Sequence, residues 1–335
     1  MQSNPMVSVA LMSYNQQDYV RQAMGCVLAQ QCNFSFEIVC GDDGSKDKTR
    51  DILLEYQQKH PGLIRVLPKE PNKGVLGNFR DTVKACKGKY VAICHSDDYW
   101  HDPLKLEKQV SFLESNPDYG VIHSGADCLL TSNGAIIKNY DENHNPDFRP
   151  ETFNGDVFEA IITGKYSIGT LTVCFKKEIF DKFVDINEYI KAGFIYEDLP
   201  SWLEMSRRTK FKYLPDSTAT YRVMQESISR SKDLNKLFGF LKNHYVIKKH
   251  FIKRYGVSKE VEDAFEIMYH RKKFNMAYKW CSYSEAGDSF DFLKERKQVD
   301  TKLWLQKKFL QYPLMRSTLK GIKELYTPKT SPSRI

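Results

Sequence analysis

The first hundred residues alternate short apolar runs with stretches of helical periodicity. Val7–Ser13, Phe36–Gly41, Ile64–Leu67 and Tyr90–Cys94 are apolar, strand-like runs. Between them, apolar side chains recur every three or four positions, which predicts amphipathic helices. Strands that alternate with helices are typical of a parallel sheet covered by helices on its faces. We therefore predict an α/β fold with a Rossmann-like, mostly parallel sheet.

Beyond residue 100 the same two patterns continue with longer spacers. We expect a helix at Lys105–Asn116, and another that opens at Tyr196–Pro200 with the proline near its first turn. Ser132–Gly134 signals a hairpin, and the polar stretch Asn139–Pro150 predicts a loop over the sheet. Further strands are expected at Tyr119–Ser124, Ala126–Leu130, Gly169–Phe175, Phe211–Leu214 and Thr218–Val223.

Charge divides the chain near residue 231. Residues 232–335 hold 23 Lys and Arg against 11 Asp and Glu, whereas residues 1–231 hold 27 against 31. The basic part is also helical in pattern and rich in aromatic residues. We therefore predict a catalytic domain over residues 1–231 and a basic, mainly helical extension over 232–335. No recognised nucleic-acid motif accompanies the basic residues, so we expect no nucleic-acid partner.

The sequence also bears on location. No stretch reaches the roughly 18–20 apolar residues that a membrane-spanning helix needs. The start does not read as a signal peptide, because strand-like sequence begins at Val7. The eight cysteines are scattered, with no C-x-x-C pair. These features lead us to expect a cytoplasmic protein with reduced cysteines.

Three of the predicted strands end in polar, turn-forming residues. These segments are Ser13–Asn15, Asp42–Ser45 and Ser96–Asp98. In parallel α/β sheets, ligands bind beyond the carboxyl ends of the strands. We expect the three segments to meet at that edge and to form a nucleotide site.

Adjacent acids recur at three points, and each pair has a chemical and an ordinary interpretation. Asp97-Asp98 could bind Mg²⁺ or Mn²⁺ with a diphosphate, or could be solvated loop acids. In Asp42-Asp43, an acid could accept the N3–H of a uracil ring, although the same segment could simply cap the next helix. Glu197-Asp198 could supply a general base, or could be acids favoured by a helix N-terminus. The residues alone leave these alternatives open.

Taken in order, these motifs resemble glycosyltransferase family 2, whose members are inverting enzymes of the GT-A fold. The likeness is to the bacterial glycosyltransferases of capsule, lipopolysaccharide and exopolysaccharide synthesis, and it covers roughly residues 5–231. The matching pieces are Val7–Asn15 (VSVALMSYN), Gly41–Thr49 (GDDGSKDKT), Asn72–Gly74 with Asn78, Lys87–Trp100 (KGKYVAICHSDDYW), Tyr196–Leu203 (YEDLPSWL) and Tyr221–Ser229 (YRVMQESIS).

The resemblance implies transfer of a sugar from a nucleotide-diphosphate donor, a UDP-sugar by family habit, to an acceptor hydroxyl. It implies that Asp198 is the catalytic base and that Glu197 orients the acceptor or the donor sugar. Asp98 would bind the Mn²⁺ or Mg²⁺ cofactor. The nucleotide would contact Ser13, Asn15, Asp43, Asn78, Asp97 and Arg222, with Asp43 at the base and Asp97 at the ribose.

Two positions depart from the family pattern. His95 stands where the family often has an acid, and we interpret it as a supporting or structural residue rather than a ligand. Met224 replaces the histidine of the family's Tyr-Arg-x-His motif, so one phosphate or metal contact is expected to be absent or supplied elsewhere. Arg222 in the same motif is expected to pair with oxygens of the departing phosphate.

Partners and alternatives follow from the same reading. The acceptor is expected to be a saccharide or a lipid-linked saccharide, in surface polysaccharide or glycolipid assembly. The basic tail could lie on the inner membrane surface, pack on the catalytic domain or form a homodimer contact. A nucleotidyltransferase stays open as an alternative, although Ser13–Asn15 lacks its usual Gly-rich loop. A non-catalytic nucleotide-sugar-binding module, which would have no need of Asp198, also stays open as an alternative.

Overall fold

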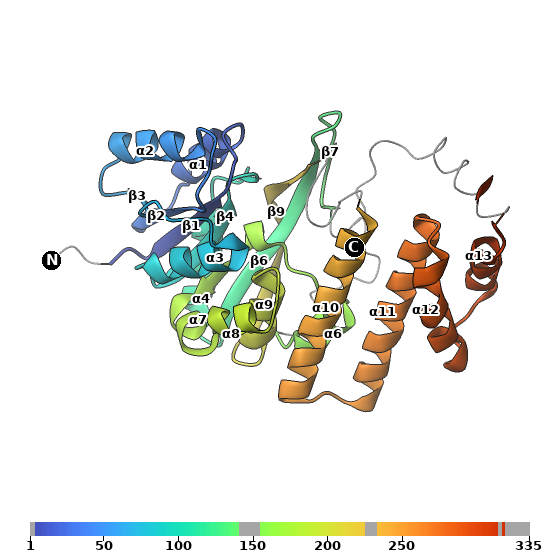
Figure 1. Cartoon of the computed structure of the whole chain (residues 1–335). Coiled ribbons are helices and arrows are strands. Elements are labelled where there is room, and N and C mark those ends of the chain that lie inside the picture. Colours follow the sequence, from blue (N-terminus) through green and yellow to red (C-terminus); the bar gives the residue numbers. More distant parts are fainter. Residues whose placement is uncertain (1–3, 141–154, 225–232, 314–316, 319–335) are drawn as a thin grey trace. The chain divides into compact units, whose positions relative to one another are not determined.

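The computed structural model of the 335-residue chain describes residues 4–140, 155–224, 233–313 and 317–318 (Figure 1). Its internal contacts divide the chain into two compact units. The sheet unit comprises Met1–Ile161 and Lys165–Val223, and the helical unit comprises Ile162–Gly164 and Met224–Ile335. The domain boundary that we predict, between residues 231 and 232, lies outside the described residues and stays a prediction.

The first part of the sheet unit is the parallel sheet that the sequence predicts. β1 (Val7–Ser13), β2 (Phe36–Asp42), β3 (Ile64–Val66) and β4 (Tyr90–His95) pair in parallel in the order β3-β2-β1-β4. The three strands β1, β2 and β4 are buried almost throughout, as strands covered on both faces are. Figure 1 shows two of the connecting helices on one side of these strands and the third on the other. They are α1 (Val20–Leu28), α2 (Thr49–Lys59) and α3 (Gly74–Ala85).

The second part of the sheet mixes parallel and antiparallel pairing. Its strands are β5 (Tyr99–Trp100), β6 (Tyr119–Leu130), β7 (Ile136–Ile137), β8 (Cys174–Lys176) and β9 (Lys210–Val223). β6 and β9 pair in parallel, and the other three join their neighbours antiparallel in the order β3-β2-β1-β4-β8-β6-β9-β5, with β7 beside β6. The pairing of β6 with β7 confirms the predicted hairpin. The two strands predicted within residues 119–130 are one strand, with irregular register around Gly125 where we expected a break.

The strand predicted at Gly169–Phe175 is largely wrong. Thr170–Thr172 form a short 3-10 helix, and the strand β8 begins only at Cys174. The backbone N–H and the hydroxyl of Thr172 both donate to the Gly169 carbonyl, at 2.8 and 2.6 Å. A threonine that bonds its own neighbouring backbone in this way competes with the ladder of a sheet.

Helices complete the sheet unit and close its core. They are α4 (Lys105–Ser115), α6 (Phe158–Thr163), α7 (Lys177–Phe183), α8 (Ile186–Lys191) and α9 (Asp198–Ser206). The core lies around the central strands and includes Val9, Leu11, Ile38, Tyr90 and Cys94, all with 0% exposure. The rigid centre of the unit therefore supports the strand ends where the polar segments lie.

The helical unit confirms the helical pattern of the basic region. It consists of α10 (Leu234–Tyr255), α11 (Lys259–Lys279), α12 (Tyr283–Glu295) and α13 (Thr301–Gln311). The side chains of Asp233, Ser258 and Asp300 cap three of these helices by accepting backbone N–H groups of the first turn. Within the described residues, none of the helices combines the length and the apolar character needed to span a bilayer. The predicted Asn139–Pro150 loop lies, beyond Tyr140, outside the described residues.

Candidate active site

The ends of β1, β2 and β4 bring the three predicted polar segments to one edge of the sheet. Ser13 lies beside Asp42 in the β1–β2 register, and Met12 lies beside His95 in the β1–β4 register. The alignment continues past the strands, because the Asp43 backbone N–H donates to the Ser13 carbonyl at 3.0 Å. The segments after these strands therefore start side by side.

The turn after β4 gathers three side chains that can bind a metal ion. Ligand atoms of His95, Asp97 and Asp98 lie within 4.8 Å of one another. Asp98 is only 3% exposed, and its Oδ1 accepts the backbone N–H of Arg222 at 2.8 Å. Burial and the charge of Asp97 raise the pKa of Asp98. A carboxylate buried beside another carboxylate is costly unless a cation offsets the two charges. We call residues 95–98 the acid turn.

The donor chemistry of the acid turn fits a divalent cation. Carboxylate oxygens suit Mg²⁺ and Mn²⁺, and an imidazole nitrogen is a common ligand of transition metals. We expected His95 to be a supporting or structural residue, whereas the structure places its ring among the candidate ligands. The buried hydroxyl of Ser96, within the same turn, has no hydrogen-bond partner among the described residues.

The second acid pair opens helix α9. Glu197 is 4% exposed, and its Oε1 lies 3.7 Å from Nε2 of His95. Burial and the charge of Asp198 raise the pKa of Glu197 to about 8. The carboxylate of Asp198 is held at both oxygens, since Oδ2 accepts the Thr170 hydroxyl at 3.0 Å and Oδ1 accepts the Leu199 N–H at 2.6 Å. Glu197 thus adjoins the acid turn through His95, and Asp198 follows it directly in the chain.

Asp43, the predicted base contact, is held by the segment that precedes α3. Its Oδ1 accepts the Lys73 N–H at 2.7 Å, and its carbonyl accepts the Asn72 side chain at 2.9 Å. Gly44 follows with a φ of 74°, in the left-handed region that glycine adopts without strain. Burial, only partly offset by the Lys73 N–H, raises the pKa of Asp43. The structure therefore joins two of the sequence motifs, which are 30 residues apart.

The other residues predicted to contact the nucleotide differ in whether their side chains already bond to other protein groups. The buried hydroxyl of Ser13 has no hydrogen-bond partner among the described residues. Asn15 adopts a φ of 52°, and its Oδ1 accepts the Lys46 N–H at 2.8 Å. Asn78 donates to the Gly41 carbonyl at 3.2 Å, in a gap where a Cβ on residue 41 would approach its Oδ1 to 2.6 Å. Of the three side chains, only that of Ser13 has no hydrogen bond among the described residues, whereas Asn78 bonds the backbone of β2.

Arg222, at the end of β9, is fixed between two tyrosine rings. Its guanidinium carbon lies 4.8 Å from the centre of the Tyr19 ring and 4.9 Å from that of Tyr99, distances typical of cation–π contacts. Nη1 donates to the Asp97 carbonyl at 2.5 Å, and Nη2 donates to the side chain of Gln22. The positive charge therefore lies against the acid turn and is held there by the protein itself.

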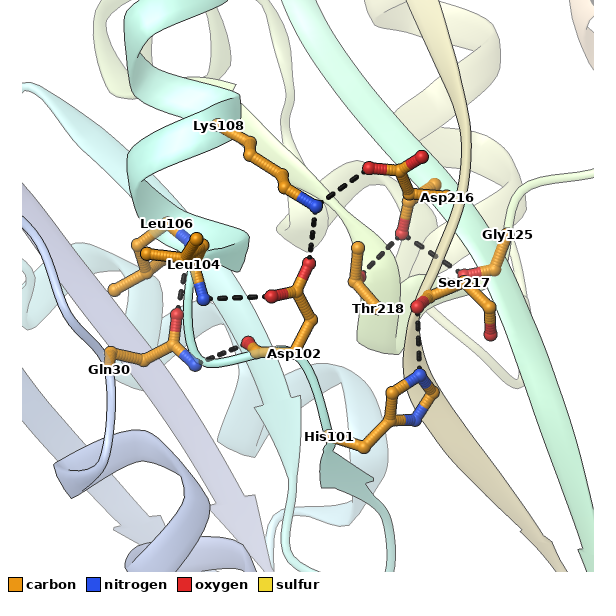
Figure 2. Close-up of polar contacts among 11 residues, drawn as sticks. Gln30, His101, Asp102, Leu104, Leu106, Lys108, Gly125, Asp216, Ser217 and Thr218 are labelled. Carbon is orange, nitrogen blue, oxygen red and sulfur yellow. Dashed lines mark hydrogen bonds and ion pairs between the residues drawn. The ribbon is translucent and has the colours of Figure 1, made fainter.

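One face of α1, with the residues that flank it, contacts Arg222 and the chain that follows the acid turn. Beyond the contacts of Tyr19 and Gln22 with Arg222, the Cys26 thiol accepts the Trp100 N–H at 3.1 Å. Just past the helix, the Gln30 amide donates to the Asp102 carbonyl at 2.9 Å (Figure 2). Side chains three or four residues apart share a helix face. We name these residues the α1 stripe: Tyr19, Gln22, Cys26 and Gln30.

Figure 2 shows how the chain beyond the acid turn is tied to β9. Lys108 bridges two carboxylates, with Asp102 at 2.9 Å and Asp216 at 2.7 Å. His101 contacts the Ser217 carbonyl through Nε2 at 2.8 Å. Because β9 also carries Arg222, these contacts hold the two segments that meet at Asp98.

Sequence reasoning missed the residues that support the acid turn. Gln22 and Tyr19 read as ordinary positions of an amphipathic helix, and Gln22 is 200 residues from Arg222. Thr170 fell in a segment that we predicted as a strand. No local signal marks any of them, because their partners are brought close only by the tertiary fold.

Comparison with known proteins places this arrangement in a family. The protein-family model described as glycosyl transferase family 2 matches residues 8–158. The putative teichuronic acid biosynthesis glycosyltransferase TuaG of Bacillus subtilis is 30% identical over 232 residues, which cover 68% of this chain and 83% of TuaG. The chain belongs to glycosyltransferase family 2.

Other similarities of this family 2 member are shorter or have lower sequence identity. An uncharacterised protein of Mycobacterium tuberculosis is 43% identical over 112 residues, so the match spans 33% of this chain and about a third, 32%, of that relative. Among solved structures, a mannosyltransferase from Pyrobaculum calidifontis, in complex with GDP-Man and Mn²⁺, aligns with a TM-score of 0.53. The alignment has 15% identity and covers 97% of this chain and 88% of that one. The predicted GT-A fold is thereby confirmed.

Proposed function

We propose that this family 2 member transfers a sugar from a nucleotide-diphosphate donor to an acceptor hydroxyl, with inversion at the sugar. One observation carries the proposal: the candidate metal ligands of the acid turn adjoin Glu197, the first acid of the pair at the start of α9, with His95 and Glu197 3.7 Å apart. A divalent cation held by Asp98 and His95 would supply positive charge to the diphosphate leaving group. The Pyrobaculum protein, which holds GDP-Man and Mn²⁺, supports both a sugar nucleotide and a metal.

Asp198 is the residue that we assign as the base. Its carboxylate is oriented by the Thr170 hydroxyl and the Leu199 N–H. Placed within reach of the acceptor, it takes the hydroxyl proton as the acceptor oxygen bonds to C1 of the sugar and the diphosphate leaves from the opposite face. Burial and the charge of Asp198 raise the pKa of Glu197, which favours its neutral form, and we assign it to sugar orientation and to holding His95.

The nucleotide is assigned to the edge formed by β1 and β2. Asp43 would accept a ring N–H of the base, Asn15 and Ser13 would line the loop beneath it, and Asp97 would face the ribose. Asn78 and Arg222 bond protein groups, so we assign them an indirect part, through Gly41 and the acid turn. Uracil is the base that we propose, and thymine presents the same N3–H.

The wider assignments rest on the same proposal. We propose that residues 1–231 form the catalytic domain and 232–335 a basic extension of a cytoplasmic enzyme. The acceptor would be a saccharide or a lipid-linked saccharide of surface polysaccharide or glycolipid assembly, which the name of TuaG supports. A homodimer through the extension stays a proposal as well.

A thermal-shift screen of nucleotide-sugars with and without Mn²⁺ tests the proposal. A ligand that binds only the folded chain raises its stability in proportion to ln(1 + [L]/Kd). We expect a UDP-sugar with Mn²⁺ to raise the melting temperature more than either alone, and the same mixture with acceptor sugars to release UDP. Stabilisation by a nucleoside triphosphate and a sugar 1-phosphate, but by no sugar nucleotide, would instead indicate a nucleotidyltransferase. Binding without release of UDP would indicate a binding module.

A further inference from the structure

The last described helix of the helical unit has two apolar faces, and only one of them is packed. Leu303 and Leu310 of α13 are buried in a cluster with residues of α11 and α12. On the other face, Trp304 is 50% exposed, Leu305 46% and Phe309 39%. Tyr312, just past the helix, is 49% exposed. Leu303 and Leu310 pack the helix against its unit, so the exposed apolar side chains are not needed for that packing.

Lysines border this exposed apolar face. Lys308 lies within it, with its Nζ 5.4 Å from the centre of the Trp304 ring, and Lys302 is exposed two residues before Trp304. Lys307 lies on the packed side instead, with its Nζ 4.7 Å from the centre of the Tyr283 ring of α12. The sequence has no Asp or Glu from Thr301 to Lys323. The carboxylate of Asp300, directly before the helix, accepts the Leu303 N–H at 2.8 Å as a cap. The face therefore combines aromatic rings with ammonium groups and no carboxylate of its own helix. We call it the α13 face: Trp304, Leu305, Phe309 and Tyr312 with Lys302 and Lys308.

Charge decides which occupant suits the α13 face. The chain beyond Pro313 carries five Lys and Arg and one Glu, and a second copy of the whole chain carries a net charge of +8. Either would bring like charge to the lysines. An anionic bilayer brings opposite charge, and its headgroup region is where Trp and Tyr rings lie with a polar edge in water. Each lysine near such a surface adds to the attraction.

We propose that the α13 face docks the protein on an anionic lipid bilayer surface. The apolar side chains enter the headgroup region, and the lysines contact acidic headgroups. This inference does not depend on sugar transfer, since docking is measured with no donor present. Failure to dock would therefore leave the proposed activity untouched, and the reverse also holds.

Co-sedimentation of the full chain with lipid vesicles tests the proposal. We expect binding to vesicles of phosphatidylcholine mixed with phosphatidylglycerol, little binding to phosphatidylcholine alone, and weaker binding as salt is added. The double variant Trp304→Ser, Phe309→Ser should bind roughly tenfold or more weakly. Changing Lys302 and Lys308 to Gln should abolish the preference for anionic vesicles.

Two controls make the outcome decisive. Ile136→Ser removes an apolar side chain that is likewise 50% exposed but lies in the β7 hairpin of the sheet unit, and it should bind as the wild type does. All variants should melt close to the wild-type temperature, because the side chains changed are exposed. Equal vesicle binding by the wild type and the double variant would overturn the proposal. So would a wild-type dimer that the double variant converts to a monomer in light scattering, because the α13 face would then be a contact between two copies.

Discussion

The two units of this molecule organise their polar groups in opposite ways. In the sheet unit, partners come from far along the chain, as where Asp98 bonds the backbone of Arg222 across 124 residues. In the helical unit, Lys249 bonds Glu262 and Glu266, only 13 and 17 residues away. The acid turn therefore depends on the fold of its whole unit, whereas the α13 face depends on one helix. Changes in the first should alter chemistry, and changes in the second should leave chemistry alone.

The assignment of chemistry to the sheet unit would be contradicted most clearly if that unit lost its proposed base, Asp198, and turnover did not change. Asp198→Asn keeps the shape of the side chain but cannot take a proton, so we expect kcat to fall roughly 10³-fold. Donor binding, measured by titration calorimetry, should persist. The rate at which the nucleoside diphosphate is released from the donor measures kcat.

Two further variants serve as controls for that measurement. Lys249→Gln, a charge removal in the helical unit, should leave kcat unchanged. Glu197→Gln should lower it less than Asp198→Asn does. If instead Asp198→Asn stays active and Glu197→Gln is inactive, the base assignment passes to Glu197.

A substitution in the acid turn should change stability and function in opposite directions. The pKa of Asp98 is raised in the folded chain, so its ionised form costs stability at pH 7, and Asp98→Asn should raise the metal-free melting temperature. The same variant should weaken Mn²⁺ binding by more than the roughly 10–100-fold typical of losing a supporting residue. Calorimetry and Mn²⁺ titration by paramagnetic resonance measure the two effects. Asp181→Asn, an exposed acid of the same unit, should bind Mn²⁺ normally, and normal binding by Asp98→Asn would remove it from the metal site.

A smaller effect is expected from the support of the acid turn. Gln22→Ala removes the acceptor that holds the Arg222 guanidinium, so Mn²⁺ affinity should fall roughly tenfold with little change in melting temperature. Gln22→Glu retains an acceptor for Arg222 and should restore most of the affinity. Arg21→Ala, an exposed neighbour on the same helix, should have no effect. Equal loss in the alanine variants of both positions would mean that α1 acts through its stability alone.

The smallest expected effect concerns pH, and it can be followed in each unit. Burial lowers the pKa of His123 in the sheet unit to about 3, and burial with the charges of Lys248 and Lys272 does the same to His244 in the helical unit. Above pH 6.5 both folded and unfolded states are neutral at these residues, so they add no pH dependence. Below it only the unfolded state takes up the protons, and each histidine should lower the free energy of unfolding by about 1 kcal/mol per pH unit. Denaturant titrations between pH 7 and 5 measure the slope, which His123→Gln and His244→Gln should each reduce.

Much of the sheet could be predicted because its strands are buried on both faces and so are apolar throughout. The polar segments at Ser13 and Asp97 followed from the ends of those strands, which parallel pairing aligns. The mixed half was harder, since Thr172 bonds its own neighbours and turns a β-rich run into a 3-10 helix. The contacts of Gln22 and Thr170 could not be predicted, because each depends on a partner that only the tertiary fold supplies.

The α1 stripe also limits how the length of this segment can change. Because its members follow one another at helical spacing, one inserted residue would turn every later member by about 100° away from its partner. A substitution at a single stripe position removes one contact, whereas an insertion displaces several at once. Protein engineers could therefore vary the outward residues of α1 freely, but should treat the number of residues between Tyr19 and Gln30 as fixed.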